Sequence, residues 1–214
     1  MNRDLHNYRK SYQKGTLDKS DVLANPMEQF RDWFHQAEIS KTVDEVNAMT
    51  LSTVNDKGMP RGRIVLLKEV TKEGFIFYTN YGSKKGQAIE HNSNVSLSFF
   101  WPSLEQQVII EGKAIKISEE KSLNYFKQRP KDSQLGALVS NQSQEVKDRE
   151  TIENRLAALQ KEYESKEVPK PDNWGGFIVK PEAFEFWQGR HSRLHDRMYY
   201  LKIDNSWEVK RLQP

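Results

Sequence analysis

The sequence predicts an α+β protein, mainly antiparallel β, whose strands form a barrel or a strongly curved sheet with peripheral helices. Three observations lead to this prediction. Short segments with a hydrophobic period of two follow one another through turns, helical patterns lie between them, and neither a repeat nor a long linker divides the 214 residues. Strands joined by short turns pair antiparallel, so a parallel nucleotide-binding sheet is not expected.

The N-terminal part combines an arm with a well-capped helix. Residues 1–19 are polar and basic, and we expect an arm outside the core, with a frayed terminus as the alternative. Residues 20–214 are expected to form a single domain. Asn25 is a suitable helix cap and Pro26 suits the first helical position. The apolar side chains that follow recur at helical spacing: Met27, Phe30, Phe34 and Ala37.

Strand patterns dominate the rest of the chain. We expect strands at 46–54, 61–70, 75–79, 94–101, 107–117, 177–179, 183–187, 193–203 and 207–212. The turn at 55–58 joins the first two strands as a hairpin, and Pro102-Ser103 joins another pair. Three further helices are expected. A short one begins at Ser83, one capped by Ser118 ends before Pro130, and the longest spans Ser143 to Lys166.

The composition excludes several classes of protein. The chain has no cysteine, which rules out disulfides, thiolate metal sites, iron–sulfur clusters and a cysteine nucleophile. Its 33 basic and 30 acidic residues give a net charge of +3, which is mild for a nucleic-acid binder. Ten Phe, eight Tyr and five Trp argue against disorder. No long apolar run or secretory leader is recognisable, so we expect a cytoplasmic protein without a membrane partner.

Familiar nucleotide and metal motifs are missing. The segment Gly82–Gly86 lacks the glycine spacing of a Walker A loop, and no dinucleotide-binding glycine fingerprint follows a strand. His191 and His195 have the spacing of metal ligands on a helix. Neighbouring arginines would repel a cation there, so no metal site is expected.

The basic residues fall into small groups beside Ser, Tyr or Gly, a pattern suited to binding separate anionic groups. Arg63 and Lys68 lie in one apolar strand, and their separation of five aims them at opposite faces unless a bulge or a strand end intervenes. Ser83-Lys84-Lys85 opens a helix, where free backbone N–H groups can bind phosphate. A plain Ser cap followed by solvated lysines is the alternative.

Two further groups stand out. Tyr125, Arg129 and Ser133 are spaced by four and four, which allows them to converge on an anion, although surface placement fits the spacing equally well. On the strand expected at 193–203, the side chains of Arg193, His195 and Arg197 share one face, with Asp196 on the other. Such a row of donors favours an anionic or electron-rich ligand lying over it.

The C-terminal segment Phe184-Glu185-Phe186-Trp187-Gln188, followed after four residues by Arg193-Leu194-His195-Asp196-Arg197, resembles the signature of the pyridoxine/pyridoxamine 5'-phosphate oxidases. The resemblance extends over nearly the whole chain. It also covers Arg9–Tyr12, Arg63–Lys68, Tyr78-Thr79, Ser83–Lys85, Gln107, Tyr125–Ser133 and Gln142-Ser143. It implies an FMN-binding split β-barrel that works as a homodimer, with the flavin at the subunit interface and residues of both chains in each site.

The resemblance also implies a role for each matching residue. The cofactor-binding set is Arg63, Ile64, Val65, Leu66, Leu67, Lys68, Tyr78, Thr79, Ser83, Lys84, Lys85, Gln107, Gln142, Ser143, Trp187 and Arg197, with Arg63, Lys84 and Lys85 on the FMN phosphate. Lys84 stands where the family usually has Arg, and a lysine offers a point charge in place of a planar two-pronged donor.

The substrate-binding set implied in the same way is Arg9, Lys10, Ser11, Tyr12, Lys68, Tyr125, Arg129, Ser133, Arg193, Leu194 and His195. By this resemblance, Lys68, Tyr125, Arg129 and Ser133 would hold the substrate phosphate. Arg193 and His195 would lie over the pyridine ring as catalytic residues, and Arg9–Tyr12 would close as a lid.

The implied reaction oxidises pyridoxine or pyridoxamine 5'-phosphate to pyridoxal 5'-phosphate. A hydride passes from the exocyclic carbon to FMN, and O2 is then reduced to H2O2. Two alternatives remain. One is a split-barrel flavin-binding protein with another substrate, against which the second phosphate site argues. The other is a nucleic-acid-binding barrel that uses basic and aromatic side chains, although we expect small-molecule substrates and no nucleic acid.

Overall fold

The structure is a computed structural model that describes residues 3–214. Its strands are β1 (Ala48–Val54), β2 (Pro60–Leu66), β3 (Glu69–Val70), β4 (Phe75–Asn80), β5 (Asn94–Trp101), β6 (Gln106–Lys116), β7 (Trp174–Gln188), β8 (Asp196–Ile203) and β9 (Ser206–Leu212). Its α-helices are α1 (Pro26–Ser40), α2 (Lys84–His91), α3 (Glu119–Gln128), α4 (Lys131–Val139) and α5 (Arg149–Glu162). A 3-10 turn, η1, spans His191–Arg193.

The strands are hydrogen-bonded into one sheet. Within residues 3–214 it has nine strands, in the order β2-β1-β5-β6-β7-β4-β3, while β8 pairs with β7 and β9 with β8. The N-terminal half of β7 pairs antiparallel with β4, and its C-terminal half pairs antiparallel with β8. The α+β class with an antiparallel sheet is confirmed.

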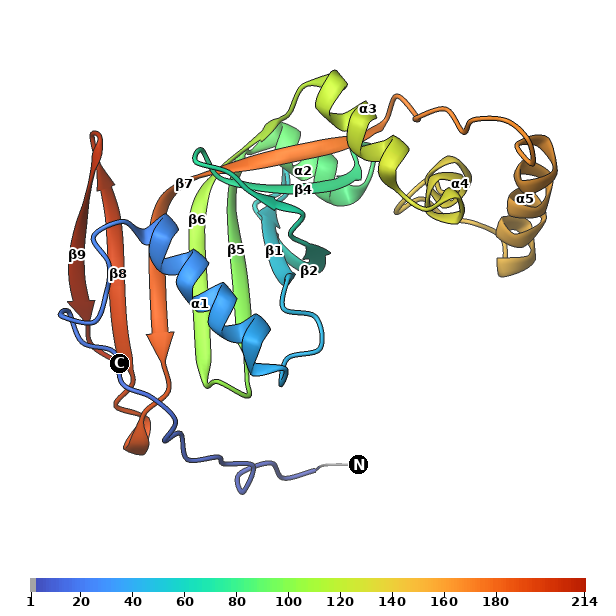
Figure 1. The fold of residues 1–214 in the computed structure, drawn as a ribbon. Helices are drawn as coiled ribbons and strands as arrows, with labels where there is room; N and C mark the ends of the chain where they lie inside the picture. The colour runs from blue at the N-terminus through green and yellow to red at the C-terminus, as the bar shows by residue number, and fades with distance from the viewer. Residues whose placement is uncertain (1–2) are drawn as a thin grey trace. The chain divides into compact units, whose positions relative to one another are not determined.

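The chain divides into two compact units. Unit 1 comprises Met1–Thr50, Ser96–Glu111 and Pro181–Pro214, and unit 2 comprises Leu51–Val95 and Gly112–Lys180. In unit 1, α1 lies along the sheet (Figure 1), with Phe30 packed 5.1 Å from Phe99 and Trp33 packed 5.3 Å from Phe186 between ring centroids. The Asn25 side chain accepts a hydrogen bond from the N–H of Met27, so the predicted cap is confirmed.

The N-terminal arm contains no helix or strand over residues 3–19, but its C-terminal part is anchored in unit 1. Leu17 is only 3% exposed, and its backbone N–H donates to a carboxylate oxygen of Asp196 at 3.0 Å. The hydroxyl of Tyr200 donates to the carbonyl of Leu23. The part of the arm around Leu17 is therefore held by specific contacts with β8.

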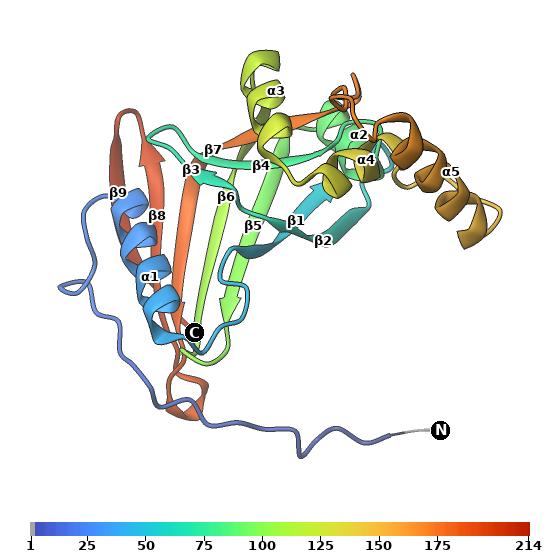
Figure 2. The ribbon, with the colours of Figure 1, turned by 45° about the vertical axis from the view of Figure 1, so that its right-hand side comes forward.

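In unit 2, the helices that follow β6 build a small core of their own. Phe126 of α3, Leu135 of α4, Val168 and Trp174 are buried together. Helices α4 and α5 lie side by side in Figures 1 and 2. Ser83 caps α2 and Ser118 caps α3, as predicted, because each side-chain oxygen accepts a backbone N–H of the first turn.

Several predicted elements differ from the structure, and one helix was not predicted. The strand expected at 61–70 is interrupted at Leu67-Lys68, and those expected at 177–179 and 183–187 are continuous in β7. The long helix begins only at Arg149, where Asp148 caps it. Helix α4 was missed, because Pro130 ends α3 and at the same time occupies the N-cap position of a new helix.

The strand expected at 193–203 begins only at Asp196. Ser192 and Arg193 both have left-handed backbone conformations, with φ of 54° and 62°, and they turn the chain before β8. The prediction that Arg193, His195 and Arg197 share one strand face is therefore wrong. Alternation of side chains holds only within a continuous extended segment.

Candidate functional site

Unit 2 contains a cavity of about 730 Å³, a size typical of small-molecule sites. Most of the residues predicted for the flavin and the substrate phosphate lie around it, although they come from several different elements. Its lining consists of Arg63, Ile64, Val65, Leu66, Lys68, Tyr78, Thr79, Asn80, Lys85, Tyr125, Arg129, Pro130, Ser133, Gly136, Ala137, Ser140, Gln142 and Trp174.

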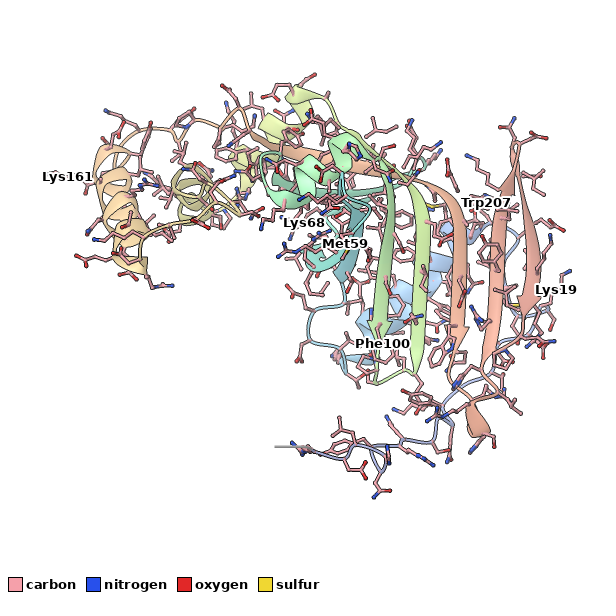
Figure 3. The ribbon with its side chains drawn as sticks, turned by 180° about the vertical axis from the view of Figure 1, so that it is seen from behind. Lys19, Met59, Lys68, Phe100, Lys161 and Trp207 are labelled. Atoms are coloured by element: carbon pink, nitrogen blue, oxygen red, sulfur yellow. The ribbon has the colours of Figure 1, made fainter. Side chains whose placement is uncertain are left out.

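Arg63 and Lys68 both line this cavity because β2 ends between them. After Leu66 the chain leaves the strand, and the backbone N–H of Lys68 donates to the carbonyl of Ile76 at 2.8 Å. The exposed side chain of Lys68 is labelled in Figure 3. Arg63 and Lys68 are five residues apart, and the strand end that lets both side chains face one cavity is present between them.

Arg63 and Lys85 form a cationic group at the cavity. Arg63 Nη1 donates to the carbonyl of Leu51 at 2.9 Å and to Thr53 Oγ1 at 2.8 Å. Lys85 Nζ donates to Gln142 Oε1 at 2.7 Å. Across residues 3–214, no carboxylate forms an ion pair with either cation.

The pKa values of this group reflect its uncompensated charge. Burial, together with the neighbouring charges of Arg63 and Arg61, lowers the pKa of Lys85 to about 8. Burial and Arg61 also lower the pKa of Arg63. Positive charges that lower one another's pKa would be relieved by a bound anion such as a phosphate.

Arg129 forms a second cationic group, on an aromatic wall. Its guanidinium lies 4.7 Å from the ring centroid of Trp174, and its Nη1 is buried with no hydrogen-bond partner among residues 3–214. The rings of Tyr78 and Tyr125 stack at 3.8 Å, and Trp174 continues the stack 5.5 Å from Tyr78. A buried guanidinium N–H without an acceptor is costly, and an anionic ligand at this position would remove that cost.

Burial dominates the pKa shifts of these groups as well. It raises the pKa of Tyr78 to about 12 and lowers the pKa of Arg129. Tyr78 therefore remains a neutral hydrogen-bond donor at physiological pH. Sequence analysis missed Trp174, because a single aromatic residue at the start of a strand gives no local signal that it will line a cavity.

Some residues predicted for the flavin lie away from this cavity. Ser83 is buried as the cap of α2, and its hydroxyl donates to the carbonyl of Asn80. Leu67 is buried in the core and Ser143 is exposed. Lys84 is exposed and lines a neighbouring cavity of about 510 Å³, to which Arg61 and Arg63 also contribute.

Unit 1 contains a second group of predicted residues, around the loop between β7 and β8. The ring of Trp187 lies 4.6 Å from that of His195, and Tyr12 of the arm packs against both. His195 Nδ1 accepts the backbone N–H of Arg190 at 3.0 Å. In its neutral form His195 therefore carries its proton on Nε2, which is a donor.

Several charged side chains around this loop form ion pairs that the local sequence does not indicate. Arg197 Nε and Nη2 donate to the two oxygens of Glu185, on the neighbouring strand β7, at 2.9 and 2.8 Å. Asp196 pairs with Arg190 and Arg211. Arg193 is exposed and forms no ion pair within the described chain. Burial is the largest cause that lowers the pKa of His195, and the positive charge of Arg193 is the second.

The predicted site residues thus fall into two sets, one in each unit. Unit 2 holds Arg63, Ile64, Val65, Leu66, Leu67, Lys68, Tyr78, Thr79, Ser83, Lys84, Lys85, Tyr125, Arg129, Ser133, Gln142 and Ser143. Unit 1 holds Arg9, Lys10, Ser11, Tyr12, Gln107, Trp187, Arg193, Leu194, His195 and Arg197.

An antiparallel α+β fold with a cation-lined, aromatic-walled cavity defines a protein that binds a small molecule with anionic groups. Residues 35–162 match the family described as Pyridoxamine 5'-phosphate oxidase, and residues 174–214 match the Pyridoxine 5'-phosphate oxidase C-terminal dimerisation region. The chain belongs to the pyridoxamine 5'-phosphate oxidase family.

Similar proteins agree with this assignment. A pyridoxine/pyridoxamine 5'-phosphate oxidase of Christiangramia forsetii is 52% identical over 214 residues, covering all of both chains. PhzG from Burkholderia lata, solved in complex with tetrahydrophenazine-1-carboxylic acid, is 25% identical with a TM-score of 0.88, over 96% of this chain and all of that one. An FMN-binding protein of Nostoc punctiforme, 16% identical with a TM-score of 0.70 over 90% of this chain and 99% of its own, shares the fold.

Among the residues that the structure describes, no helix has the length and apolar character needed to cross a membrane. Residues 3–214 likewise contain no group of three or more His, Asp or Glu side chains arranged to hold a metal ion.

Proposed function

We propose that this protein oxidises pyridoxine 5'-phosphate and pyridoxamine 5'-phosphate to pyridoxal 5'-phosphate with FMN as cofactor, using O2 as the electron acceptor and releasing H2O2. The observation that carries the proposal is the unit 2 cavity, where two groups of cations come from different elements. Each can hold one phosphate, and the proposed reaction brings together two phosphate-bearing molecules. Relatives about half identical over the whole chain bear the name of this oxidase.

The residues around the cavity fit FMN. Arg63 and Lys85 lack carboxylate partners within residues 3–214, so a phosphate would compensate their charge. Lys85 also donates to Gln142, which places an amide beside the cation. We assign the FMN phosphate to Arg63 and Lys85, with Lys84 alongside. When bound, FMN would supply the hydride-accepting redox chemistry that no side chain of this protein can provide.

The second cation group suits the substrate phosphate. Arg129, held against Trp174, has a buried donor without an acceptor, and Lys68, Tyr125 and Ser133 line the same cavity. Fixing the phosphate at one end of the substrate orients the remainder of the molecule, which is how remote binding energy is used for catalysis.

The unit 1 residues would complete the site from a second subunit. The match of residues 174–214 to a dimerisation region supports a homodimer. We propose that Arg193 and His195 lie over the pyridine ring, where neutral His195 offers a donor at Nε2. Residues 1–19 would act as the lid over bound substrate. The absence of cysteine fits a reducing compartment, and we propose a cytoplasmic location.

Anaerobic reduction of the bound flavin tests the activity. The purified protein is expected to be yellow, to bleach when pyridoxine 5'-phosphate is added without oxygen, and to recover its colour in air with formation of H2O2. Unphosphorylated pyridoxine at the same concentration is the matched control and should bleach it far more slowly, because it lacks the group that Arg129 would bind. If pyridoxine 5'-phosphate leaves the flavin oxidised, the oxidase proposal fails and only flavin binding remains.

FMN affinity should depend on the charge of Lys85. In the free protein its pKa is about 8, and a bound phosphate stabilises the protonated ammonium. Binding therefore takes up a proton above pH 8, and the Kd for FMN should increase by up to about tenfold per pH unit from that point. Titration of the apoprotein with FMN between pH 7 and 9.5 measures this dependence.

Lys85→Met should bind FMN about tenfold more weakly at pH 7, which is the order of magnitude of one charge-assisted hydrogen bond. Its Kd for FMN should also lack the step near pH 8, that is, the increase that begins there in the wild type. Lys72→Met, at an exposed lysine of the β3–β4 turn, is the matched control and should retain both the affinity and the step. A step near pH 8 that persists in Lys85→Met would show that another group titrates.

A further inference from the structure

Glu105 is a buried carboxylate whose partners all come from the N-terminal arm. The residue lies in the turn between β5 and β6 and is 2% exposed. Its Oε2 accepts the backbone N–H groups of Gln13 at 2.6 Å and Lys14 at 2.9 Å, and Lys10 Nζ lies 3.8 Å from Oε1. Within residues 3–214 the carboxylate has no other hydrogen-bond or ion-pair partner. A buried charge requires such partners, so Glu105 and the arm depend on each other.

The backbone of Glu105 holds the loop that follows β7. Its carbonyl accepts the N–H of Gly189 at 2.8 Å and the side-chain amide of Gln188 at 3.2 Å. This loop continues into Arg193 and His195. A single residue therefore contacts the arm through its side chain and the candidate catalytic loop through its main chain.

The arm covers this loop closely. The Tyr12 ring lies 5.7 Å from that of Trp187 and 5.8 Å from that of His195, and Ser11 Oγ is 3.2 Å from His191 Nδ1. Lys14 Nζ donates to the carbonyl of Ser103 in the same β5–β6 turn, at 2.6 Å. Contacts with Glu105 and Ser103 thus fix the chain directly after Tyr12.

Two glycines leave room for this arrangement. A Cβ at Gly189 would lie 2.7 Å from the ring of Tyr12, and one at Gly15 would lie 2.9 Å from the side chain of Gln188. Real Cβ atoms do not approach other atoms so closely. At Gly189 the contact is with the base of the Tyr12 side chain, so a larger residue there would push the arm and the loop apart, whereas at Gly15 the flexible end of the Gln188 side chain could move aside. The β5–β6 turn, the loop and the arm are shaped to fit one another.

We propose that Glu105 is a positioning residue for the oxidation: its carboxylate holds arm residues 10–14 against the loop of residues 188–195, so that Tyr12 covers Trp187 and His195 and encloses the substrate. This inference rests on the proposed function. Without the carboxylate, the N–H groups of Gln13 and Lys14 lose their acceptor, and the arm opens to hydrate them. Substrate then meets a protein whose arm is mostly open. The apparent affinity for substrate falls in proportion to the fraction of protein whose arm is closed.

Amide hydrogen exchange in the FMN-loaded protein tests the contact directly, without any need for turnover. In Glu105→Ala, the Gln13 and Lys14 amides should exchange about tenfold faster or more, because local opening controls their exchange. Glu105→Gln keeps one neutral acceptor oxygen and should lie between the wild type and Glu105→Ala. Glu208→Ala, at an exposed carboxylate paired with Lys210 in β9, is the matched control and should leave these amides unchanged.

Steady-state kinetics then test the consequence. Glu105→Ala should raise the KM for pyridoxine 5'-phosphate about tenfold and change kcat by less than about twofold, since bound substrate itself favours the closed arm and saturation restores closure. Gly189→Ala should reproduce both effects without touching the carboxylate, because it displaces Tyr12. It therefore tests the arrangement even if Glu105→Ala does not fold.

Each result has a definite consequence. Gln13 and Lys14 amides that stay protected in Glu105→Ala would overturn the anchoring contact. Faster exchange with an unchanged KM would overturn the positioning role. A wild-type protein that fails to oxidise pyridoxine 5'-phosphate would refute the proposed function instead, while the exchange measurement would still decide whether Glu105 holds the arm.

Discussion

Replacing Arg193 with methionine is expected to lower kcat about 100-fold or more, a loss of about 2.7 kcal/mol of transition-state stabilisation, while the FMN content stays within about twofold of the wild type. Arg193 follows Ser192 in a turn where both residues have a left-handed backbone, a conformation that costs free energy in residues other than glycine. The turn presents an exposed guanidinium with no ion pair inside the described chain. Because this turn holds beside His195 a cation without an ion pair in the described chain, we expect Arg193 to act in binding or catalysis.

The pKa of His195 supplies an independent readout for the same variant. Burial and, after it, the charge of Arg193 lower this pKa, so Arg193→Met should raise it part of the way toward the ordinary histidine value, which a titration followed by NMR would detect. The matched control is Arg155→Met, at an exposed arginine of α5, which should leave kcat and the His195 pKa unchanged. Equal losses of FMN and of turnover in Arg193→Met would show that the residue is structural.

Replacing Arg129 with leucine is expected to raise the KM for pyridoxine 5'-phosphate about 100-fold, the order of two charge-assisted hydrogen bonds to a phosphate. The ligand-free protein should lose no stability, and its thermal unfolding temperature should stay the same or increase. In the wild type, Arg129 Nη1 is buried without an acceptor in the described part of the chain, and burial lowers the pKa of the guanidinium. An apolar side chain over Trp174 removes that cost.

Lys127→Leu is the matched control for this variant. Lys127 lies two residues earlier, in the last turn of α3, with its side chain exposed. The Lys127→Leu variant should have the same KM and the same unfolding temperature as the wild type. If Arg129→Leu unfolds at a clearly lower temperature, the guanidinium stabilises the fold, and if its KM is unchanged, the substrate phosphate binds elsewhere.

Local signals predicted most elements of the fold. The Asn25 cap with Pro26 begins α1, Ser83 and Ser118 cap the next two helices, and alternating hydrophobicity marks most of the strands. Each of these signals acts within one or two turns of chain. The errors arose where a local pattern allows two outcomes, as at Pro130, which ends one helix and precedes another.

The candidate site could be predicted only in part. The family resemblance predicted binding roles for residues such as Arg63, Tyr125 and Arg129, and the structure brings these residues together around one cavity. It gave no indication that Arg197 would pair with Glu185, because that contact depends on the register in which β7 pairs with β8. Trp174 became part of the cavity for a comparable reason, through its packing on side chains of β4 and α3.

The sequence by itself determined the α+β class, most of the elements, the family to which the chain belongs, and the supply of basic side chains for two anionic groups in a protein with a net charge of only +3. Only the tertiary structure decided which cations remain unpaired. Among the described residues, Arg63, Lys85 and Arg129 have no carboxylate partner, while Arg197 is paired with Glu185 and buried Glu105 accepts hydrogen bonds from the arm. Burial and ion pairing depend on contacts between residues far apart in the chain, and no local pattern specifies them.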